Sequence, residues 1–412
     1  MEFGGIDLVG LADRYGTPLY VTHEDRIREN YRRIEGAFKK QYPKTNVNFA
    51  CKANTNLAIL RILEQEGSGI DAVSTGEIHL ALNAGFSPER ILYTANNFSN
   101  DELKYAVDKG VMINLDDVSQ IEKLVRIGKP EVVSFRVNPE VGAGHHDHCI
   151  TAGKNVKFGI IERDIAKAYE LAREKGFEKF GIHMHIGSGI LDPNPFELAV
   201  KKMMDVVGKL SEKGVSFGFI DIGGGFGVPY KGEKELDVEK TAQIITDVFK
   251  EGCSRYGLGE PYLYIEPGRY LVCDSTILLT RVNTVKKAYR NFVGVDAGFN
   301  VLIRPAFYGS YHEVIVANKS DEKPVEKYDI VGPICESGDV LAKDRLLPEV
   351  EENDILAVMN AGAYGFSMSS NYNSRPRPAE VLIHDGKSEI IREREGLEDL
   401  EAGQQIPERL RR

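Results

Sequence analysis

The residues best suited to chemistry stand directly after short apolar segments of the chain. Lys52 lies near the end of the segment 47–53, and an amine at the end of a buried strand is unfavourable unless it has a task. A Schiff base with an aldehyde is one such task; the alternative is a lysine whose amine reaches solvent at the rim. His183 and His185 occur in the segment 181–186, where strand alternation places both on one face. Imidazoles there would bind a metal, act as a base, stack on a flat ring or simply pack in the core.

Two further segments end in groups suited to an anion and to a ring nitrogen. The run DIGGGFG, residues 221–227, contains glycines whose N–H groups could surround a phosphate, although a structural turn is the alternative. A dinucleotide-binding fingerprint is excluded because Val228 stands where a third glycine is required. Glu266 closes the segment 263–266 and could hold a pyridinium N–H, and Arg269 could bind an anion. A salt bridge at a barrel rim is the alternative for this pair.

The elements that must position these groups alternate regularly. Strands are predicted at residues 47–53, 70–74, 91–95, 112–115, 132–137, 181–186, 218–222 and 263–266. Amphipathic helical patterns precede or separate them, at residues 26–40, 57–66, 101–109, 164–175, 196–213 and 238–256. Eight such units predict a (β/α)8 barrel of the TIM type over residues 25–270, with functional groups at the carboxyl ends of the strands. A doubly wound sheet is the rival fold.

The pattern of predicted elements changes after Arg269, so the predicted fold class is α/β plus all-β. Strand-like segments recur without long helices at residues 277–282, 292–295, 313–317, 329–332, 355–359, 380–384 and 389–392. We therefore predict a C-terminal β-sandwich or β-barrel domain over residues 271–412. Residues 1–24 are expected to join it, with a strand near residues 18–21, and the domain is expected to complete the active site.

Composition narrows the class of protein. The chain has 412 residues, which favours two domains, and a net charge of -10, which argues against a nucleic-acid partner. Five cysteines without a CxxC spacing indicate reduced thiols, and no apolar stretch approaches the length of a membrane helix. Without a signal peptide pattern, a cytoplasmic location is expected. Residues 144–149 carry three histidines, an aspartate and a cysteine, but their crowded spacing disfavours a metal site. We expect a substrate- or interface-lining loop there, and no metal.

An aldehyde-capturing lysine, a stacking histidine, a phosphate cradle and a ring-nitrogen carboxylate together make the set of groups that pyridoxal phosphate (PLP) requires. The chain resembles the alanine-racemase-fold PLP decarboxylases over nearly its whole length. Within that family, four motifs are similar to those of the branch that acts on diaminopimelate. They lie at residues 296–298, 302–306 (LIRPA), 332–339 (GPICESGD) and 362–376 (GAYGFSMSSNYNSRP).

The resemblance implies a role for each residue. Lys52 would form the Schiff base, His185 would stack on the cofactor ring and Glu266 would pair with the ring nitrogen. The cofactor phosphate would be surrounded by Ser188, Gly224, Gly225, Gly268 and Arg269. The substrate's distal carboxylate would be held by Arg269, Arg304 and Tyr308. Its distal ammonium would bind Glu336, Tyr364 would contact cofactor and substrate, and Cys335 would donate a proton.

The implied reaction is decarboxylation of meso-2,6-diaminopimelate to L-lysine and CO2, the last step of lysine biosynthesis. The implied assembly is an obligate homodimer in which Cys335 and Glu336 reach the partner's site. Two arginines suit a substrate with a second carboxylate, and the polyamine-forming enzymes of the family carry Cys-Asp in place of Cys335-Glu336. Alternatives are a decarboxylase of lysine, ornithine or arginine, an amino-acid racemase on the same barrel, and an inactive PLP-binding regulator. Gly189 stands where this branch usually has glutamine. The smaller glycine would widen the pocket.

Overall fold

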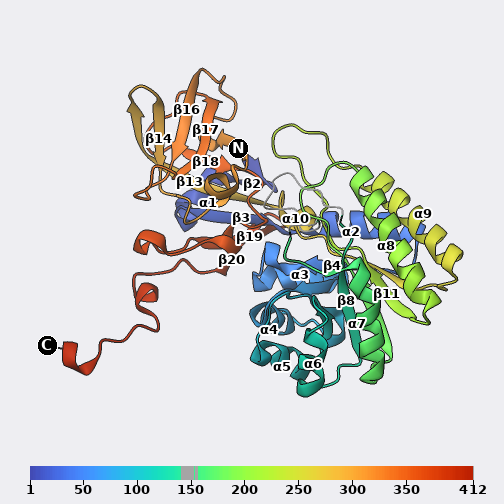
Figure 1. Ribbon diagram of the computed structural model, residues 1–412. Helices are drawn as coiled ribbons and strands as arrows, with labels where there is room; N and C mark the ends of the chain where they lie inside the picture. The colour runs from blue at the N-terminus through green and yellow to red at the C-terminus, as the bar shows by residue number, and fades with distance from the viewer. Residues whose placement is uncertain (141–152, 154–155, 412) are drawn as a thin grey trace. The chain divides into compact units, whose positions relative to one another are not determined.

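The computed structural model describes residues 1–140, 153 and 156–411 (Figure 1). The chain divides into two compact units. One consists of Asp25–Cys273, and the other joins Met1–Glu24 to Asp274–Arg412. The segment 144–149, predicted to line the site or an interface, lies outside the described residues.

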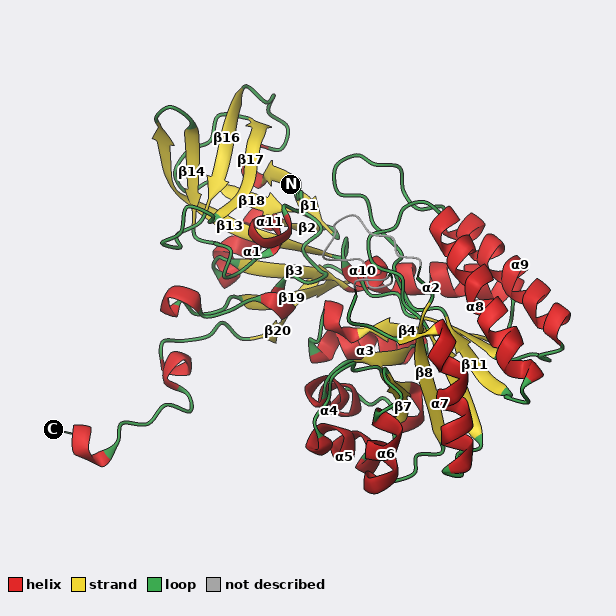
Figure 2. Ribbon diagram, in the orientation of Figure 1, coloured by secondary structure: helices red, strands yellow, loops and turns green. Residues whose placement is uncertain are grey.

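The unit Asp25–Cys273 is a closed barrel of eight parallel strands (Figure 2). Its strands are β4 (Thr45–Ala50), β5 (Gly69–Ala72), β6 (Ile91–Tyr93), β7 (Met112–Leu115), β8 (Val132–Asn138), β10 (Lys179–His183), β11 (Phe217–Asp221) and β12 (Tyr262–Ile265). The ring closes because β10 pairs with β8 on one side and with β11 on the other. The short strand β9 (Ile160–Ile161) pairs with β8. The predicted barrel is confirmed, and the doubly wound sheet is excluded.

Helices follow the strands and cover the barrel, which explains why the strand segments read as apolar runs: they are buried on both faces. The helices are α2 (Glu24–Gln41), α3 (Leu57–Glu66), α4 (Thr75–Asn83), α5 (Asn100–Asp108), α6 (Gln120–Ile127), α7 (Glu162–Glu174), α8 (Asn194–Glu212), α9 (Val238–Tyr256) and α10 (Arg269–Val272). Local sequence sets their starts: α5, for example, begins with a reciprocal capping box between Ser99 and Glu102.

Two strand boundaries that matter for the site were predicted wrongly. The predicted strand 47–53 ends at Ala50, and Cys51–Ala53 form a 3-10 turn. The predicted strand 181–186 ends at His183, so His185 lies in the loop beyond it. In both places the apolar residues past the strand end stay buried, and apolar character alone does not show where the backbone leaves the sheet.

The other unit is built on a large sheet whose continuous path runs β17-β16-β14-β13-β3-β19-β20, with β15 and β18 attached through β13. Its strands are β1 (Glu2–Phe3), β2 (Ile6–Asp7), β3 (Leu19–His23), β13 (Thr276–Lys287), β14 (Asn291–Val295), β15 (Val314–Val316), β16 (Glu326–Val331), β17 (Val340–Leu347), β18 (Ile355–Val358), β19 (Ala379–His384) and β20 (Lys387–Arg392). Two short helices, α1 (Leu8–Tyr15) and α11 (Arg304–Tyr308), accompany them. The predicted β domain is confirmed.

The N-terminal strand β3 lies inside this sheet, between β13 and β19. Its residues are fully buried up to Thr22, and Tyr20 donates its hydroxyl to the carbonyl of Val301 at 2.7 Å. The first residues of the chain are therefore structural members of the C-terminal unit. None of the helices in the described part of the chain combines the length and apolarity needed to cross a bilayer.

Candidate active site

Lys52 projects from the turn after β4, and its amine is paired with Asp71 of β5. The two atoms, Nζ and Oδ2, are 2.5 Å apart, and the Asp71 side chain is only 1% exposed. Thr94 donates its hydroxyl to the other carboxylate oxygen, Oδ1. Asp71 is therefore fixed from two sides, and it provides the charge that balances a lysine at the edge of the barrel interior.

A cavity of about 320 Å³ opens above the carboxyl ends of the barrel strands. This volume suits a small cofactor. Its lining residues are Lys52, Asp71, Val73, Thr94, Ala95, Asn96, Arg136, Lys157, Phe158, His183, His185 and Glu266. A larger hollow of about 500 Å³ lies on the outside of the barrel, beside α7 and α8, but it contains none of the strand-end groups. We take the smaller cavity as the candidate site.

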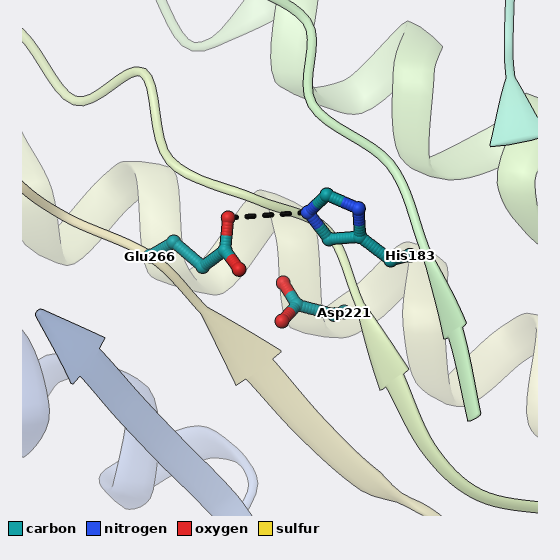
Figure 3. Close-up of side chains that lie close together, drawn as sticks. All are labelled: His183, Asp221 and Glu266. Atoms are coloured by element: carbon teal, nitrogen blue, oxygen red, sulfur yellow. Dashed lines mark hydrogen bonds and ion pairs between the residues drawn. The ribbon is translucent and has the colours of Figure 1, made fainter. Parts of the chain in front are cut away.

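Three buried acid–base side chains meet at the floor of this region (Figure 3). His183 is 1% exposed, Asp221 0% and Glu266 4%. One ligand atom from each lies within 4.8 Å of the others. His183 Nε2 is 3.2 Å from Glu266 Oε2, and the carboxyl groups of Asp221 and Glu266 share a hydrogen bond. A buried carboxylate held in this way has the right chemistry to receive the protonated nitrogen of an aromatic ring.

His185 is held by a backbone contact. Its Nδ1 accepts a hydrogen bond from the N–H of Gly224 at 3.1 Å. Burial, reinforced by the positive charges of Arg136 and Lys52, brings the pKa of His185 well below its ordinary value. The imidazole is therefore neutral, and it offers a flat surface rather than a charge to the cavity.

The glycine run after β11 behaves differently from the prediction. The N–H groups were expected to face a phosphate, but that of Gly223 donates to Asp221 Oδ1 at 2.8 Å and that of Gly224 donates to His185. For these two groups the expectation of free donors is wrong. Gly224 instead provides space, because a Cβ there would meet the backbone of Glu266. That Gly224 and Gly225 lie around the phosphate stays a prediction.

Ser188 and Arg269, two residues predicted to surround the phosphate, lie together in the barrel unit. Arg269 Nη2 donates to Ser188 Oγ at 3.2 Å, and Nη1 donates to the hydroxyl of Tyr230 at 2.7 Å. The Tyr230 hydroxyl also lies 2.9 Å from Cys273 Sγ. Gly268 precedes this group, and a Cβ there would lie 3.1 Å from Ala50, so the chain passes close to the end of β4. The cluster is a cation-bearing, hydroxyl-rich corner of the kind that binds phosphate.

The remaining predicted residues belong to the sheet unit. Arg304 begins α11, is 2% exposed, and donates to Ser310 Oγ at 3.1 Å. Its guanidinium carbon lies 6.0 Å from the ring centre of Tyr308, at the end of the same short helix. Tyr364 has a φ of 58°, a left-handed conformation that is uncommon for a bulky side chain and is concentrated at functional positions.

Cys335 and Glu336 are exposed on the sheet unit. The hydroxyl of Tyr372 donates to Glu336 Oε1 at 2.6 Å, and Tyr372 stacks on Phe299 with ring centres 5.6 Å apart. The N–H of Cys335 donates to Asn373 Oδ1 at 2.9 Å. The exposed pair is thus ordered by the motif at residues 362–376, which supplies the tyrosine and the asparagine.

Several site residues were not predicted, although most of them are ionisable groups at recognisable places in the sequence. Asp71 and Arg136 are charged residues inside strands that were predicted to be buried, and Asp221 opens the glycine run. The same signal, an ionisable group in an apolar strand, had identified Lys52 and Glu266. Tyr230 carried no signal, because it lies in a loop and its contacts with Arg269 arise only on folding.

The comparisons with known proteins agree with this geometry. Residues 25–273 match the family model described as "Pyridoxal-dependent decarboxylase, pyridoxal binding domain". The chain is 60% identical to the diaminopimelate decarboxylase of Methanothermobacter thermautotrophicus, over 99% of this chain and 96% of that protein. It is 45% identical to the enzyme of Archaeoglobus fulgidus, over 98% and 96% of the two chains.

Solved structures lead to the same group. The crystal structure of diaminopimelate decarboxylase from M. jannaschii in co-complex with L-lysine superposes with a TM-score of 0.90 at 36% identity, covering 98% of this chain and 96% of that one. Since the family model covers more than half of the chain and the relatives align over nearly all of it, the predicted resemblance is confirmed. The chain belongs to the diaminopimelate decarboxylases, a branch of the pyridoxal-dependent decarboxylases.

Proposed function

We propose that this chain uses PLP to decarboxylate meso-2,6-diaminopimelate to L-lysine and CO2, the last step of lysine biosynthesis. The observation that carries the proposal is a cavity that is lined by both the paired amine of Lys52 and the buried carboxylate of Glu266. An amine and a carboxylate that line one small cavity match the aldehyde and the ring nitrogen of PLP. The relatives named above act on diaminopimelate, which gives the substrate.

When PLP is bound, its protonated ring accepts the electron pair that is left when CO2 departs. The residues of this chain hold that ring in place. Glu266 would receive the ring N–H, the neutral imidazole of His185 would pack against a ring face, and Lys52 would hold the aldehyde. Asp71 keeps the lysine oriented toward the cavity through the 2.5 Å contact with Nζ.

We assign substrate selection to the groups that bind the far end of diaminopimelate. Arg269, Arg304 and Tyr308 bind the distal carboxylate, Glu336 binds the distal ammonium, and Tyr364 contacts both substrate and cofactor. Lysine and ornithine lack the distal carboxylate, so either would leave buried guanidinium groups without an anion. The burial of Arg304 supports this assignment, because a desolvated cation discriminates strongly between substrates with and without a matching charge.

The test of this function is a comparison of kcat/KM for diaminopimelate, lysine, ornithine and arginine, with CO2 release as the readout. Diaminopimelate should be the preferred substrate by a wide margin. Equal use of any monocarboxylate would contradict the proposed distal pocket, and Gly189 would be the first position to examine. Racemisation without CO2 would support the racemase instead, and PLP binding without turnover would support the inactive regulator.

We further propose a homodimer with shared active sites, working in the cytoplasm. Cys335 and Glu336 are exposed on their own unit, and a thiol that protonates an intermediate should be covered while it acts. A partner subunit would supply that cover, with Cys335 Sγ giving the proton.

Mixing Lys52→Ala subunits with Cys335→Ala subunits tests this sharing. Half of the randomly reassorted dimers are mixed, and each mixed dimer has one site with both lesions and one site with neither. Activity should therefore recover to about a quarter of wild type. No recovery, despite subunit exchange verified by mass spectrometry of tagged chains, would mean that each site is built from one chain.

A further inference from the structure

The buried cluster of His183, Asp221 and Glu266 contains more ionisable groups than the ring nitrogen of a cofactor needs. Glu266 alone supplies the carboxylate in the proposed function. His183 comes from β10 and Asp221 from β11, so both are set by the barrel rather than by loops. Figure 3 shows the three side chains pointing toward one another. Their common burial requires that every charge in the group be compensated.

Two side chains hold the carboxyl group of Glu266. His183 Nε2 lies 3.2 Å from Oε2. The carboxyl groups of Asp221 and Glu266 also share a hydrogen bond, and Figure 3 shows the second oxygen of Glu266 turned toward Asp221. Two carboxyl groups can share a hydrogen bond only if one of them keeps its proton. The imidazole and the second carboxyl group thereby fix the orientation of Glu266.

The two carboxyl groups of the cluster, those of Asp221 and Glu266, differ in how readily they keep a proton. Two carboxylates this close in a buried site cannot both be charged. Burial, with the charge of Glu266, raises the pKa of Asp221 well above its ordinary value. Burial also works to raise the pKa of Glu266, but the charge and hydrogen bond of His183 outweigh it, so the net shift is downward. Lys52 adds to the downward shift of the Glu266 pKa.

We propose that His183 and Asp221 are positioning residues for Glu266: His183 holds Oε2, and Asp221, as an uncharged acid, gives the shared hydrogen bond to the same carboxylate, so that Glu266 is the single anion of the cluster and is held in place for the ring nitrogen. The inference rests on the proposed role of Glu266. It assigns Asp221 a structural hydrogen bond, from the N–H of Gly223 to Oδ1, and a protonated carboxyl that does not compete for the ring proton.

The experiment measures the affinity of apoenzyme for PLP and for 1-deaza-PLP, in which a C–H replaces the ring nitrogen. A residue that acts through Glu266 on this nitrogen should affect the first cofactor and not the second. The variants are His183→Leu, which removes the donor, His183→Gln, which keeps an N–H near the position of Nε2, and Asp221→Asn, which mimics a neutral acid. Glu266→Gln is the reference for loss of the anion.

We expect His183→Leu to weaken PLP binding by about 5- to 10-fold, the scale of one lost hydrogen bond to a charged group. Binding of 1-deaza-PLP should be unchanged in the same variant. His183→Gln and Asp221→Asn should stay within about 2-fold of wild type for both cofactors, while Glu266→Gln should lose at least about 10-fold for PLP alone. Ser134→Ala is the matched control: it breaks a buried hydrogen bond to Asn114 between β8 and β7 and should leave both affinities unchanged.

The outcomes separate the inference from the function on which it rests. If Glu266→Gln binds both cofactors as wild type does, the assigned role of Glu266 is wrong, and the inference fails with it. If Glu266→Gln behaves as expected but His183→Leu weakens both cofactors equally, or neither, His183 is only a packing residue. If Asp221→Asn loses PLP affinity as Glu266→Gln does, the charge resides on Asp221 and the assignment of the proton is overturned. Thermal unfolding of each apoenzyme identifies a variant that has not folded, and if His183→Leu is such a variant, His183→Met, which also lacks a donor, takes its place.

Discussion

Gly224→Ala is the substitution that probes the packing of the site most directly. The backbone of Gly224 has no positive φ, so alanine introduces no conformational strain there. Its Cβ would, however, lie 3.0 Å from the carbonyl carbon of Glu266 and closer still to the carbonyl oxygen. Ordinary contacts between carbon atoms are about 3.5–4.0 Å. The overlap is with backbone, which cannot swing away as a flexible side chain could.

The magnitude follows from what must move. Overpacking in a close-packed interior destabilises by about 1–3 kcal/mol, and the atoms displaced here belong to the residue that we assign to the ring nitrogen. For a unit of this size, about 1 kcal/mol lowers Tm by about 2–4 °C, so a loss of about 2–12 °C is expected. Affinity for PLP should fall by about 10-fold or more, because a shift of Glu266 weakens a charged hydrogen bond.

The assay compares Tm of the apoenzyme and PLP affinity in Gly224→Ala and in a matched control, Gly218→Ala. Gly218 lies on β11, the strand that precedes Gly224. It is exposed, and its Cβ would meet only the carbonyl oxygen of Phe180 at an ordinary 3.8 Å. The control should be neutral or slightly stabilising, since alanine is preferred to glycine within a strand. A Gly224→Ala protein with the Tm and PLP affinity of wild type would refute the close approach of these two backbone segments.

Three further predictions concern the anchor, the distal pocket and the buried proton. Lys52→Ala should abolish the absorbance of bound cofactor, and borohydride reduction of wild type followed by peptide mapping should mark Lys52 alone; a second labelled lysine would contradict the assignment. Arg304→Ala should lower kcat/KM for diaminopimelate by about 30-fold or more, the effect of leaving a buried charge unpaired, while spectroscopic titration should give unchanged PLP affinity. Because the pKa of Asp221 is raised on folding, the folded state keeps a proton that the unfolded chain releases above about pH 4, so wild-type stability falls as pH rises. Asp221→Asn removes that slope, up to about 1.4 kcal/mol per pH unit, so its Tm advantage over wild type should grow between pH 5 and pH 8; a constant difference would mean that Asp221 is ionised in the folded protein.

The sequence was sufficient to predict the barrel and the main groups of the site, because both depend on local patterns. Apolar runs buried on two faces are recognisable one at a time, and Lys52 and Glu266 stood out as ionisable groups at their ends. Strand ends were harder, because the apolar residues beyond Ala50 and His183 stay buried after the strand pairing stops. Hydrophobicity reports burial and does not distinguish a strand from the turn that follows it.

Contacts between distant segments could not be predicted. The hydrogen bond from the N–H of Gly224 to His185 and the hydrogen bond between Arg269 and Tyr230 join segments that are adjacent only in the folded barrel. The strand β17 was also missed, since its sequence VLAKDRLL carries three consecutive charged residues and its burial does not alternate. Pairing with β16 determines this strand, and cross-strand partners are not visible in a local window.

The central place of β3 in the sheet has a consequence for how the protein is made. Leu19 pairs with both Leu279 and Ala379, so this strand leaves the ribosome long before either neighbour exists. At about 5–20 residues per second, the apolar strand is without its partners for on the order of ten seconds or more, while the barrel between them can already close. Such long-range pairing makes folding slow and leaves an unpaired, aggregation-prone strand exposed. We therefore expect nascent chains to need protection at their first residues, and refolding in vitro to be limited by the sheet unit while the barrel forms early.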